Sequence, residues 1–120
     1  MSVIKVGIIG EGRSGRYIHG NMLVRLADKY VITAVADGLE DRRQRAEKEY
    51  GCKAYATYEE MVANEELDLV VNASPSDLHF PITLDLLNKG FNVLCEKPLA
   101  KTAAEVDELI AASKRSGKLL

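Results

Sequence analysis

Tryptophan is absent from this chain of 120 residues, and cysteine and proline are scarce, with two and three copies. The two cysteines, Cys52 and Cys95, form no CxxC pair and lie away from any histidine cluster in the sequence. The ligand spacing of a zinc site is therefore missing, and we expect no metal. Isolated cysteines are also typical of a reducing compartment, which predicts a cytoplasmic protein.

Long apolar runs and an excess of positive charge are missing as well. No stretch approaches the ~18 apolar residues that a membrane span requires, and the amino-terminal apolar stretch is short and interrupted by Lys5, unlike a signal peptide. Sixteen Lys and Arg face 18 Asp and Glu, for a formal net charge of −2, so the basic footprint of nucleic-acid-binding proteins is absent. We expect neither a membrane nor a nucleic acid as partner.

The chain does contain an alternation of short apolar runs with helical patterns. The apolar runs predict five strands, at Val3–Ile9, Val31–Ala36, Lys53–Ala56, Leu67–Ala73 and Asn92–Cys95. The segments between and after them predict helices at Ser14–Lys29, Glu40–Tyr50, Tyr58–Asn64, Ile82–Lys89 and Thr102–Ser116, the last with Thr102 as N-cap and Glu105 three residues later. The closing "GKLL" predicts the start of a sixth strand.

Two of these runs, "VITAVA" and "LDLVVNA", are too continuously apolar for strands with one solvated face, which indicates burial on both sides. Repeated strand–helix units imply right-handed crossovers between parallel strands. The predicted fold class is therefore α/β, a doubly wound parallel sheet, in a single domain over residues 1–120, truncated near the sixth strand.

Three glycines follow the first predicted strand in the stretch "GEGRSG". A GxGxxG pattern alone is weak evidence, but here Gly10 ends a buried strand and Gly15 opens a helix. In that setting the first glycine permits a tight turn, the second lets backbone approach a pyrophosphate, and the third packs helix against strand. The helix N-terminus offers free N–H groups to the phosphates. The loop thus predicts a dinucleotide-binding site at Gly10, Gly12, Arg13, Ser14 and Gly15.

Asp37 ends the second predicted strand, about 20 residues past the last glycine, where an acidic residue accepts hydrogen bonds from the adenosine ribose. Its carboxylate would repel a 2′-phosphate, which favours NAD over NADP as the cofactor. Arg42 and Arg43 could reach a 2′-phosphate instead, but we favour the interpretation that both lie on a solvated helix face within "EDRRQRAEKE". A structural turn with a surface aspartate is the alternative to a cofactor site.

Two further segments, "NASPSDLH" at residues 72–79 and "CEKPLA" at residues 95–100, follow the fourth and fifth predicted strands. Open α/β sheets bind ligands at this edge. With "GEGRSG" and Asp37, these segments make the whole chain resemble the amino-terminal Rossmann domain of the Gfo/Idh/MocA oxidoreductase family. The segment "ASPSDLH" stands against the family's Thr-Pro-Asn-x-x-His, and "EKP" directly after the fifth strand is the most specific match.

The resemblance implies roles for the residues of "EKP". Lys97 corresponds to the family lysine that reaches the nicotinamide ribose and the substrate hydroxyls, and it is the expected catalytic residue. Glu96 would help to hold the ribose and the loop, and Pro98 would shape the turn, often as a cis peptide. Without these neighbours, Lys97 would be interpreted as an exposed loop lysine.

The resemblance also implies that Ser74, Pro75 and Ser76 line the nicotinamide half of the site, although Ser76 replaces the family's asparagine. His79 matches the histidine of the motif, and a cofactor-binding role and a structural role are both open for it. His19, within the first predicted helix, is interpreted as a packing or surface residue.

The resemblance also implies a second domain that supplies most of the substrate pocket, and we expect this chain to end before it. For the full-length protein we expect hydride transfer from a sugar-like or polyol secondary alcohol to NAD, and a homo-oligomer; we expect the 120-residue chain alone to be inactive. A non-catalytic NAD-binding sensor of the same fold is the alternative. The intact "EKP" favours the enzyme, and it also disfavours a general nucleotide-binding module.

Overall fold

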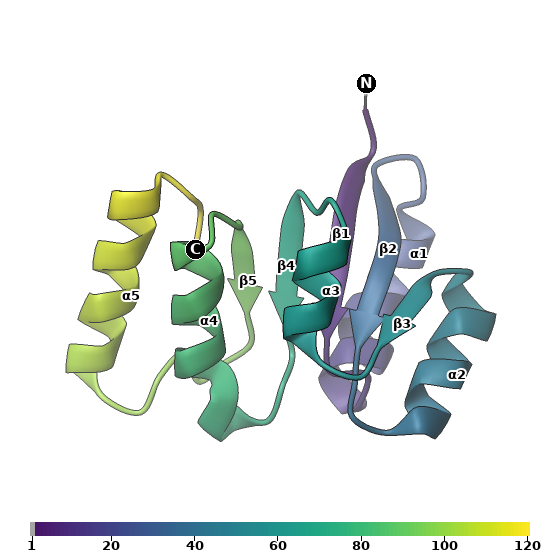
Figure 1. Ribbon diagram of the computed structural model, residues 1–120, viewed down its shortest axis with the longest axis horizontal. Helices are drawn as coiled ribbons and strands as arrows, with labels where there is room; N and C mark the ends of the chain where they lie inside the picture. The colour runs from purple at the N-terminus through teal and green to yellow at the C-terminus, as the bar shows by residue number, and fades with distance from the viewer. Residues whose placement is uncertain (1) are drawn as a thin grey trace.

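The computed structural model describes residues 2–120 and shows one parallel sheet with helices on both faces (Figure 1). The strands are β1 (Ile4–Ile9), β2 (Tyr30–Ala36), β3 (Lys53–Tyr55), β4 (Leu69–Asn72) and β5 (Val93–Cys95). Their order across the sheet is β3-β2-β1-β4-β5, and every neighbouring pair is parallel. The predicted fold class is confirmed, with β4 shorter than predicted at both ends.

The helices are η1 (Arg13–Gly20), α1 (Asn21–Arg25), α2 (Glu40–Tyr50), α3 (Tyr58–Asn64), η2 (Ser76–Leu78), α4 (His79–Asn88) and α5 (Ala103–Ser116). Thr102 is the N-cap of α5, and its Oγ1 accepts a hydrogen bond from the backbone N of Glu105 at 3.1 Å, as predicted. Helix α4 begins before the predicted Ile82 because Pro81 lies in its first turn, where a backbone N–H has no intrahelical partner to lose.

The first predicted helix, residues 14–29, differs most from the structure. It divides into η1, a π-helix, and the short α1, which ends at Arg25. A π-helix bonds each residue to the fifth along the chain, and Gly15 and Gly20, five residues apart, are both buried. A Cβ at Gly20 would overlap the Tyr50 hydroxyl of α2. The close contact between η1 and α2 therefore requires a glycine at position 20.

The sheet is covered on both faces, as the continuous apolar runs predicted. On one face the strands pack against α3, α4 and α5, and the buried side chains include Ile9, Ala34, Ala36, Met61, Val70, Leu86, Leu87, Val93 and Leu109. On the other face they pack against α1 and α2, around Val6, Ile8, Ile32, Val35, Ala46 and Val71. Successive strand residues alternate between the two clusters because side chains along a strand point to opposite faces.

The chain reverses its direction of progress across the sheet between β1 and β4. From β1 it moves outward to β2 and β3, and the connection through α3 then crosses to β4 and β5 on the other side. The carboxyl ends of β1 and β4 thus adjoin at the switch point, where open α/β sheets hold their ligands, at the lower edge of Figure 1.

The closing residues form no strand, which corrects the predicted start of a sixth one. They nevertheless lie beside β5, because the Leu119 carbonyl oxygen accepts a hydrogen bond from the backbone N of Val93 at 3.0 Å. The backbone N of Leu119 also donates to Asn92 Oδ1 at 2.9 Å. Across residues 2–120, no helix combines the length and the apolar character needed to cross a membrane.

Candidate dinucleotide-binding site

The glycine loop between β1 and η1 depends on two of its glycines for its shape. Gly10 has a left-handed backbone, with φ of 89°, and a Cβ there would lie 2.5 Å from the carbonyl oxygen of Ala73 on the neighbouring β4 loop. A Cβ at Gly15 would overlap the carbonyl oxygen of Gly10. Gly12 differs, because its Cβ would meet only the Arg42 guanidinium, at 3.2 Å. Gly12 therefore keeps space open beside the loop rather than packing within the fold.

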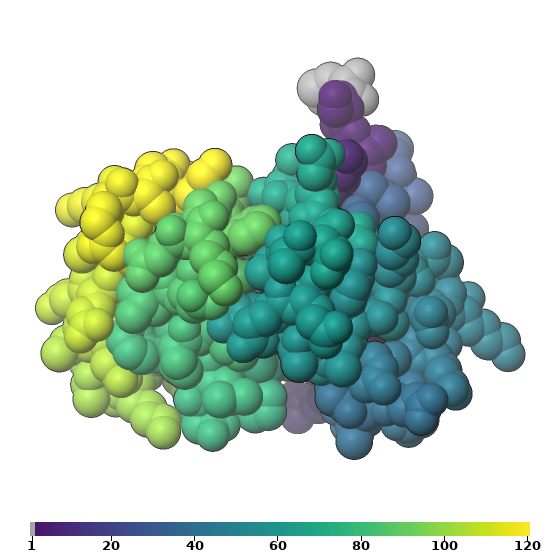
Figure 2. Space-filling view, viewed as in Figure 1, coloured from purple at the N-terminus to yellow at the C-terminus, as the bar shows by residue number. Residues whose placement is uncertain are grey.

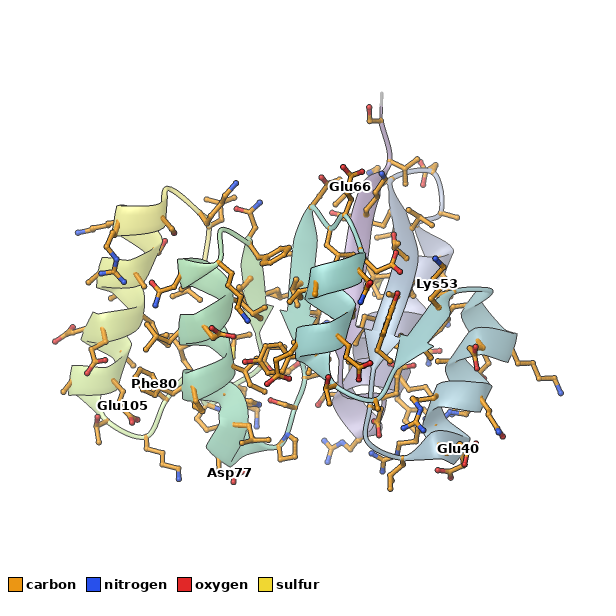
Figure 3. The ribbon with its side chains drawn as sticks, viewed as in Figure 1. Glu40, Lys53, Glu66, Asp77, Phe80 and Glu105 are labelled. Carbon is orange, nitrogen blue, oxygen red and sulfur yellow. The ribbon has the colours of Figure 1, made fainter. Side chains whose placement is uncertain are left out.

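A cleft of about 880 Å³ lies at the carboxyl ends of β1, β2 and β4. Figure 2 shows the surface notched at its lower edge, between the green atoms of α4 and the blue atoms of α2, and Figure 3 labels Asp77 and Glu40 at that edge. Seven predicted cofactor residues line the cleft: Gly10, Gly12, Arg13, Ser14, Asp37, Ser74 and Pro75. Gly15, Ser76, His79, Glu96 and Lys97 are not among its lining residues.

Asp37 is held rigidly at the mouth of this cleft. Its Oδ2 accepts a hydrogen bond from the backbone N of Glu11 at 2.8 Å, and its Oδ1 accepts one from the backbone N of Leu39 at 2.9 Å. The side chain is only 7% exposed. The carboxylate thereby ties the glycine loop to the end of β2, and each of its oxygens retains a lone pair for a further hydrogen bond in the cleft that Asp37 lines.

Both arginines that follow Asp37 turn toward it, so the interpretation of a solvated helix face is wrong for this pair. Arg42 Nη1 lies 3.5 Å from Asp37 Oδ2, and Arg42 lines the cleft. Arg43 Nη1 donates to the Asp37 carbonyl oxygen at 2.9 Å. The cleft thus presents both a carboxylate and a guanidinium where an adenosine ribose would lie.

These residues fit the adenosine diphosphate half of a dinucleotide. The glycine loop leads directly into η1, whose first backbone N–H groups have no helical partner and are therefore available to a phosphate. Asp37 offers hydrogen-bond acceptors in the same cleft. A site for a metal is not apparent, because residues 2–120 hold no group of three or more His, Cys, Asp or Glu side chains placed to bind one.

The second residue of the loop, Glu11, is fully buried, which sequence reasoning missed. In the described part of the chain neither of its carboxyl oxygens has a hydrogen-bond partner. Burial raises the pKa of Glu11 to about 7, and the neighbouring Tyr50 hydroxyl and Arg45 guanidinium lower it only in part. The available signal was a charged residue directly after a buried strand, between two glycines.

The β4 loop is shaped by a buried network around Asn72. Asn72 Nδ2 donates to Thr83 Oγ1 at 3.0 Å, while its Oδ1 accepts a hydrogen bond from Ser74 Oγ at 2.6 Å. His79, 2% exposed, has Nε2 at 2.8 Å from the Ser74 carbonyl oxygen and Nδ1 at 2.7 Å from that of Pro98. His79 therefore joins the β4 and β5 loops, which favours the structural alternative for this residue.

The loop after β5 carries Lys97 at the same edge of the sheet. The Lys97–Pro98 peptide bond is cis, as the resemblance implied for Pro98. Lys97 is exposed, and its backbone N donates to Glu96 Oε2 at 3.2 Å. The other carboxyl oxygen of Glu96, Oε1, lies 2.7 Å from His19 Nε2 of η1, so His19 is a partner of the Lys97 loop rather than a packing or surface residue.

The fold and the cleft together define a nucleotide-binding α/β domain of the Rossmann type. A family model described as "Oxidoreductase family, NAD-binding Rossmann fold" matches residues 4–120, and the chain belongs to this Gfo/Idh/MocA family. That membership confirms the resemblance drawn from "GEGRSG", "ASPSDLH" and "EKP".

Individual relatives are dehydrogenases. The chain is 35% identical over 112 residues to trans-1,2-dihydrobenzene-1,2-diol dehydrogenase of Xenopus laevis, covering 92% of this chain and 34% of that protein. It is 32% identical over 121 residues to an NADP(+)-dependent scyllo-inositol 2-dehydrogenase of Bacillus subtilis, covering 100% and 33%. The chain thus spans about a third of the length of these relatives.

A solved structure shows the same fold with cofactor bound. The WlbA dehydrogenase of Chromobacterium violaceum, solved with NADH and UDP-GlcNAcA, matches with a TM-score of 0.91 at 27% identity. The match covers 97% of this chain and 33% of the other. The chain is therefore the NAD-binding Rossmann domain of an oxidoreductase family.

Proposed function

We propose that the chain is the cofactor domain of a dehydrogenase that moves a hydride from a secondary alcohol of a sugar or polyol to NAD. The cleft at the switch point carries the proposal, because the glycine loop and Asp37 line it together. Relatives named as diol and inositol dehydrogenases support the substrate class. NAD, when bound, would supply the hydride acceptor.

Different residues of the chain would bind different parts of the cofactor. The backbone of Gly12, Arg13 and Ser14 would bind the pyrophosphate at the start of η1. Asp37 would accept hydrogen bonds from the adenosine ribose, and Ser74 and Pro75 would line the way toward the nicotinamide. These roles are supported by the presence of all these residues on the wall of one cleft.

Lys97 is the residue we propose for proton handling at the substrate hydroxyl. Lys97 is exposed on the β5 loop, at the carboxyl edge of the sheet, and Glu96 accepts a hydrogen bond from its backbone N. An amine next to a hydroxyl undergoing oxidation can hold that oxygen and take its proton. A non-catalytic sensor is the alternative, and it would retain the cleft without need of this amine.

A binding titration with a loop variant tests the proposed cofactor site. Gly12→Val should abolish NAD binding and leave the domain folded, since φ of Gly12 is −82° and its Cβ would meet only the end of Arg42. Calorimetric titration with NAD measures the affinity, and circular dichroism measures the fold.

Ile110→Val is the matched control, because Ile110 is exposed on α5 and is not a lining residue of the cleft. It should bind NAD like the unmodified chain. If Gly12→Val binds NAD with unchanged affinity, the loop does not hold the pyrophosphate and the proposed site is wrong. The homo-oligomer and the cytoplasmic location stay predictions.

A further inference from the structure

His19 lies where two segments distant in the sequence meet. Its Nε2 is 2.7 Å from Glu96 Oε1, although the two residues are 77 positions apart. Their side chains are 17% and 21% exposed, so the contact is largely shielded from water. The hydrogen bond from His19 is the main reason that the pKa of the Glu96 carboxyl is lowered, which keeps that carboxyl an acceptor.

The same Glu96 carboxylate also binds the backbone of Lys97. Glu96 Oε2 accepts a hydrogen bond from the Lys97 backbone N at 3.2 Å, and the backbone N of Glu96 donates to the Asn72 carbonyl oxygen at 3.0 Å. On the far side of Lys97, the carbonyl oxygen of Pro98 contacts His79. Of these hydrogen bonds, only the one between Glu96 and His19 connects the loop to η1, the helix that follows the glycine loop.

The π-helical form of η1 determines the direction in which the His19 side chain points, toward the β5 loop. A π-helix accommodates more residues per turn than an α-helix, so the residues after the wide turn face a different direction. Here that turn keeps Gly15 and Gly20 buried together, while His19 reaches the β5 loop.

From this geometry we infer that His19 is a positioning residue for Lys97, acting through the Glu96 carboxylate to hold the Lys97 loop beside the helix that follows the glycine loop. The inference rests on the proposed function, because it assigns the Lys97 loop to the nicotinamide half of the cofactor. Loss of the imidazole would remove the connection between the Lys97 loop and η1, while the glycine loop and Asp37 would keep their own contacts.

Two variants separate the hydrogen bond from the bulk of the side chain. His19→Gln places an amide Nε2 donor where the imidazole Nε2 lies, and His19→Leu retains apolar bulk without a donor. Affinities for NAD and for ADP, which lacks the nicotinamide half, are measured by calorimetric titration. We expect His19→Leu to weaken NAD binding roughly fivefold with ADP binding unchanged, and His19→Gln to restore most of the loss. Ile18→Ala, an exposed neighbour on η1, is the control.

A second measurement does not depend on NAD. Amide hydrogen exchange by NMR should accelerate at residues 96 and 97 in His19→Leu, but neither in His19→Gln nor at residues 10–15. Equal losses of NAD and ADP affinity, or equal behaviour of the Gln and Leu variants, would overturn the inference. If the unmodified chain binds ADP but not NAD, the proposed function fails, and the exchange rates alone decide the role of His19.

Discussion

At the scale of single residues, Glu11 is an ionisable side chain in a fully buried position that disfavours its charged form. A carboxylate buried without hydrogen-bond partners is costly, so the group takes up a proton more readily than in water. Its backbone nevertheless serves the site, since the Glu11 N donates to Asp37 and the Glu11 carbonyl oxygen accepts from Arg45 Nη2 at 2.5 Å. The side chain beneath the loop is therefore a source of pH dependence in stability.

The stability prediction concerns Glu11→Gln. The folded pKa of about 7 exceeds the ordinary 4.5, so the folded state binds more protons, and the contribution of Glu11 to stability is lost as the pH rises through 7. Glu11→Gln should remove this decline. The melting temperature of the variant minus that of the unmodified chain should therefore be larger at pH 8 than at pH 5. Thermal unfolding at both values measures it.

Glu66→Gln is the control for this comparison, because the Glu66 side chain is 92% exposed. It should show the same pH profile as the unmodified chain. Parallel profiles for Glu11→Gln and the unmodified chain would contradict the assignment of the pH dependence to Glu11.

The cofactor prediction concerns Asp37 and Arg42. Asp37→Ser should lower the preference for NAD over NADP by roughly tenfold, because it removes a negative charge that would lie within a few ångströms of the 2′-phosphate. Arg42→Ala should act in the opposite direction, since the Arg42 guanidinium lies 3.5 Å from the same carboxylate. Titration of both cofactors into each variant gives the ratios.

Asp37→Asn is the matched variant that keeps an oxygen acceptor for the glycine loop while removing the charge. It should lower the preference about as much as Asp37→Ser. If the unmodified chain binds NADP as tightly as NAD, Arg42 outweighs Asp37 and the predicted NAD preference is wrong.

The glycines and Asp37 could be predicted at this scale because they form a known sequence pattern, three spaced glycines after a strand and an acidic residue about 20 positions later. The positive φ of Gly10 is the conformation that the first glycine of this pattern provides. The contacts of His19 and Arg42 could not be predicted in the same way. Only the packed fold brings His19 to Glu96, 77 positions away, and the sequence alone does not fix on which side of α2 the Arg42 side chain lies.

At the scale of whole elements, the predictions succeeded where pattern and caps agree. Helix α3 begins and ends as predicted, and its N-cap Thr57 accepts a hydrogen bond from the backbone N of Glu60. Helix α2 likewise keeps its bounds and ends at the left-handed Gly51. In both elements the local hydrogen bonds of the ends and the side-chain pattern point to the same residues.

The elements that were mispredicted are those whose form depends on a neighbour. No local pattern in residues 14–29 distinguishes a π-helix from an α-helix, because the wide turn is set by the approach of Gly20 to Tyr50. The closing "GKLL" has strand-like residues, yet only the Leu119 carbonyl oxygen meets β5. Tertiary contacts, not propensity, decide both outcomes.

At the scale of the whole molecule, seven of the predicted cofactor residues share one cleft, and the other five are not among its lining residues. The cleft holds the glycine loop, Asp37 and the β4 loop, whereas Lys97 is exposed outside it. Apolar side chains on η1 and α1, among them Ile18, Met22 and Val24, are also exposed. The chain spans about a third of the length of these relatives.

The last prediction follows from the exposure of Lys97: the chain should bind NAD yet catalyse no turnover. The residues proposed to hold the cofactor lie together, but nothing in residues 2–120 encloses Lys97 against water or orients an alcohol beside it. Orientation of reacting groups contributes up to ~7–11 kcal/mol in well-positioned systems, and exclusion of water strengthens the remaining interactions. Calorimetry should detect NAD binding, while absorbance at the NADH band should stay flat with a panel of inositols, sugars and vicinal diols. Steady NADH formation that Lys97→Ala removes would show instead that these 120 residues already form a working active site.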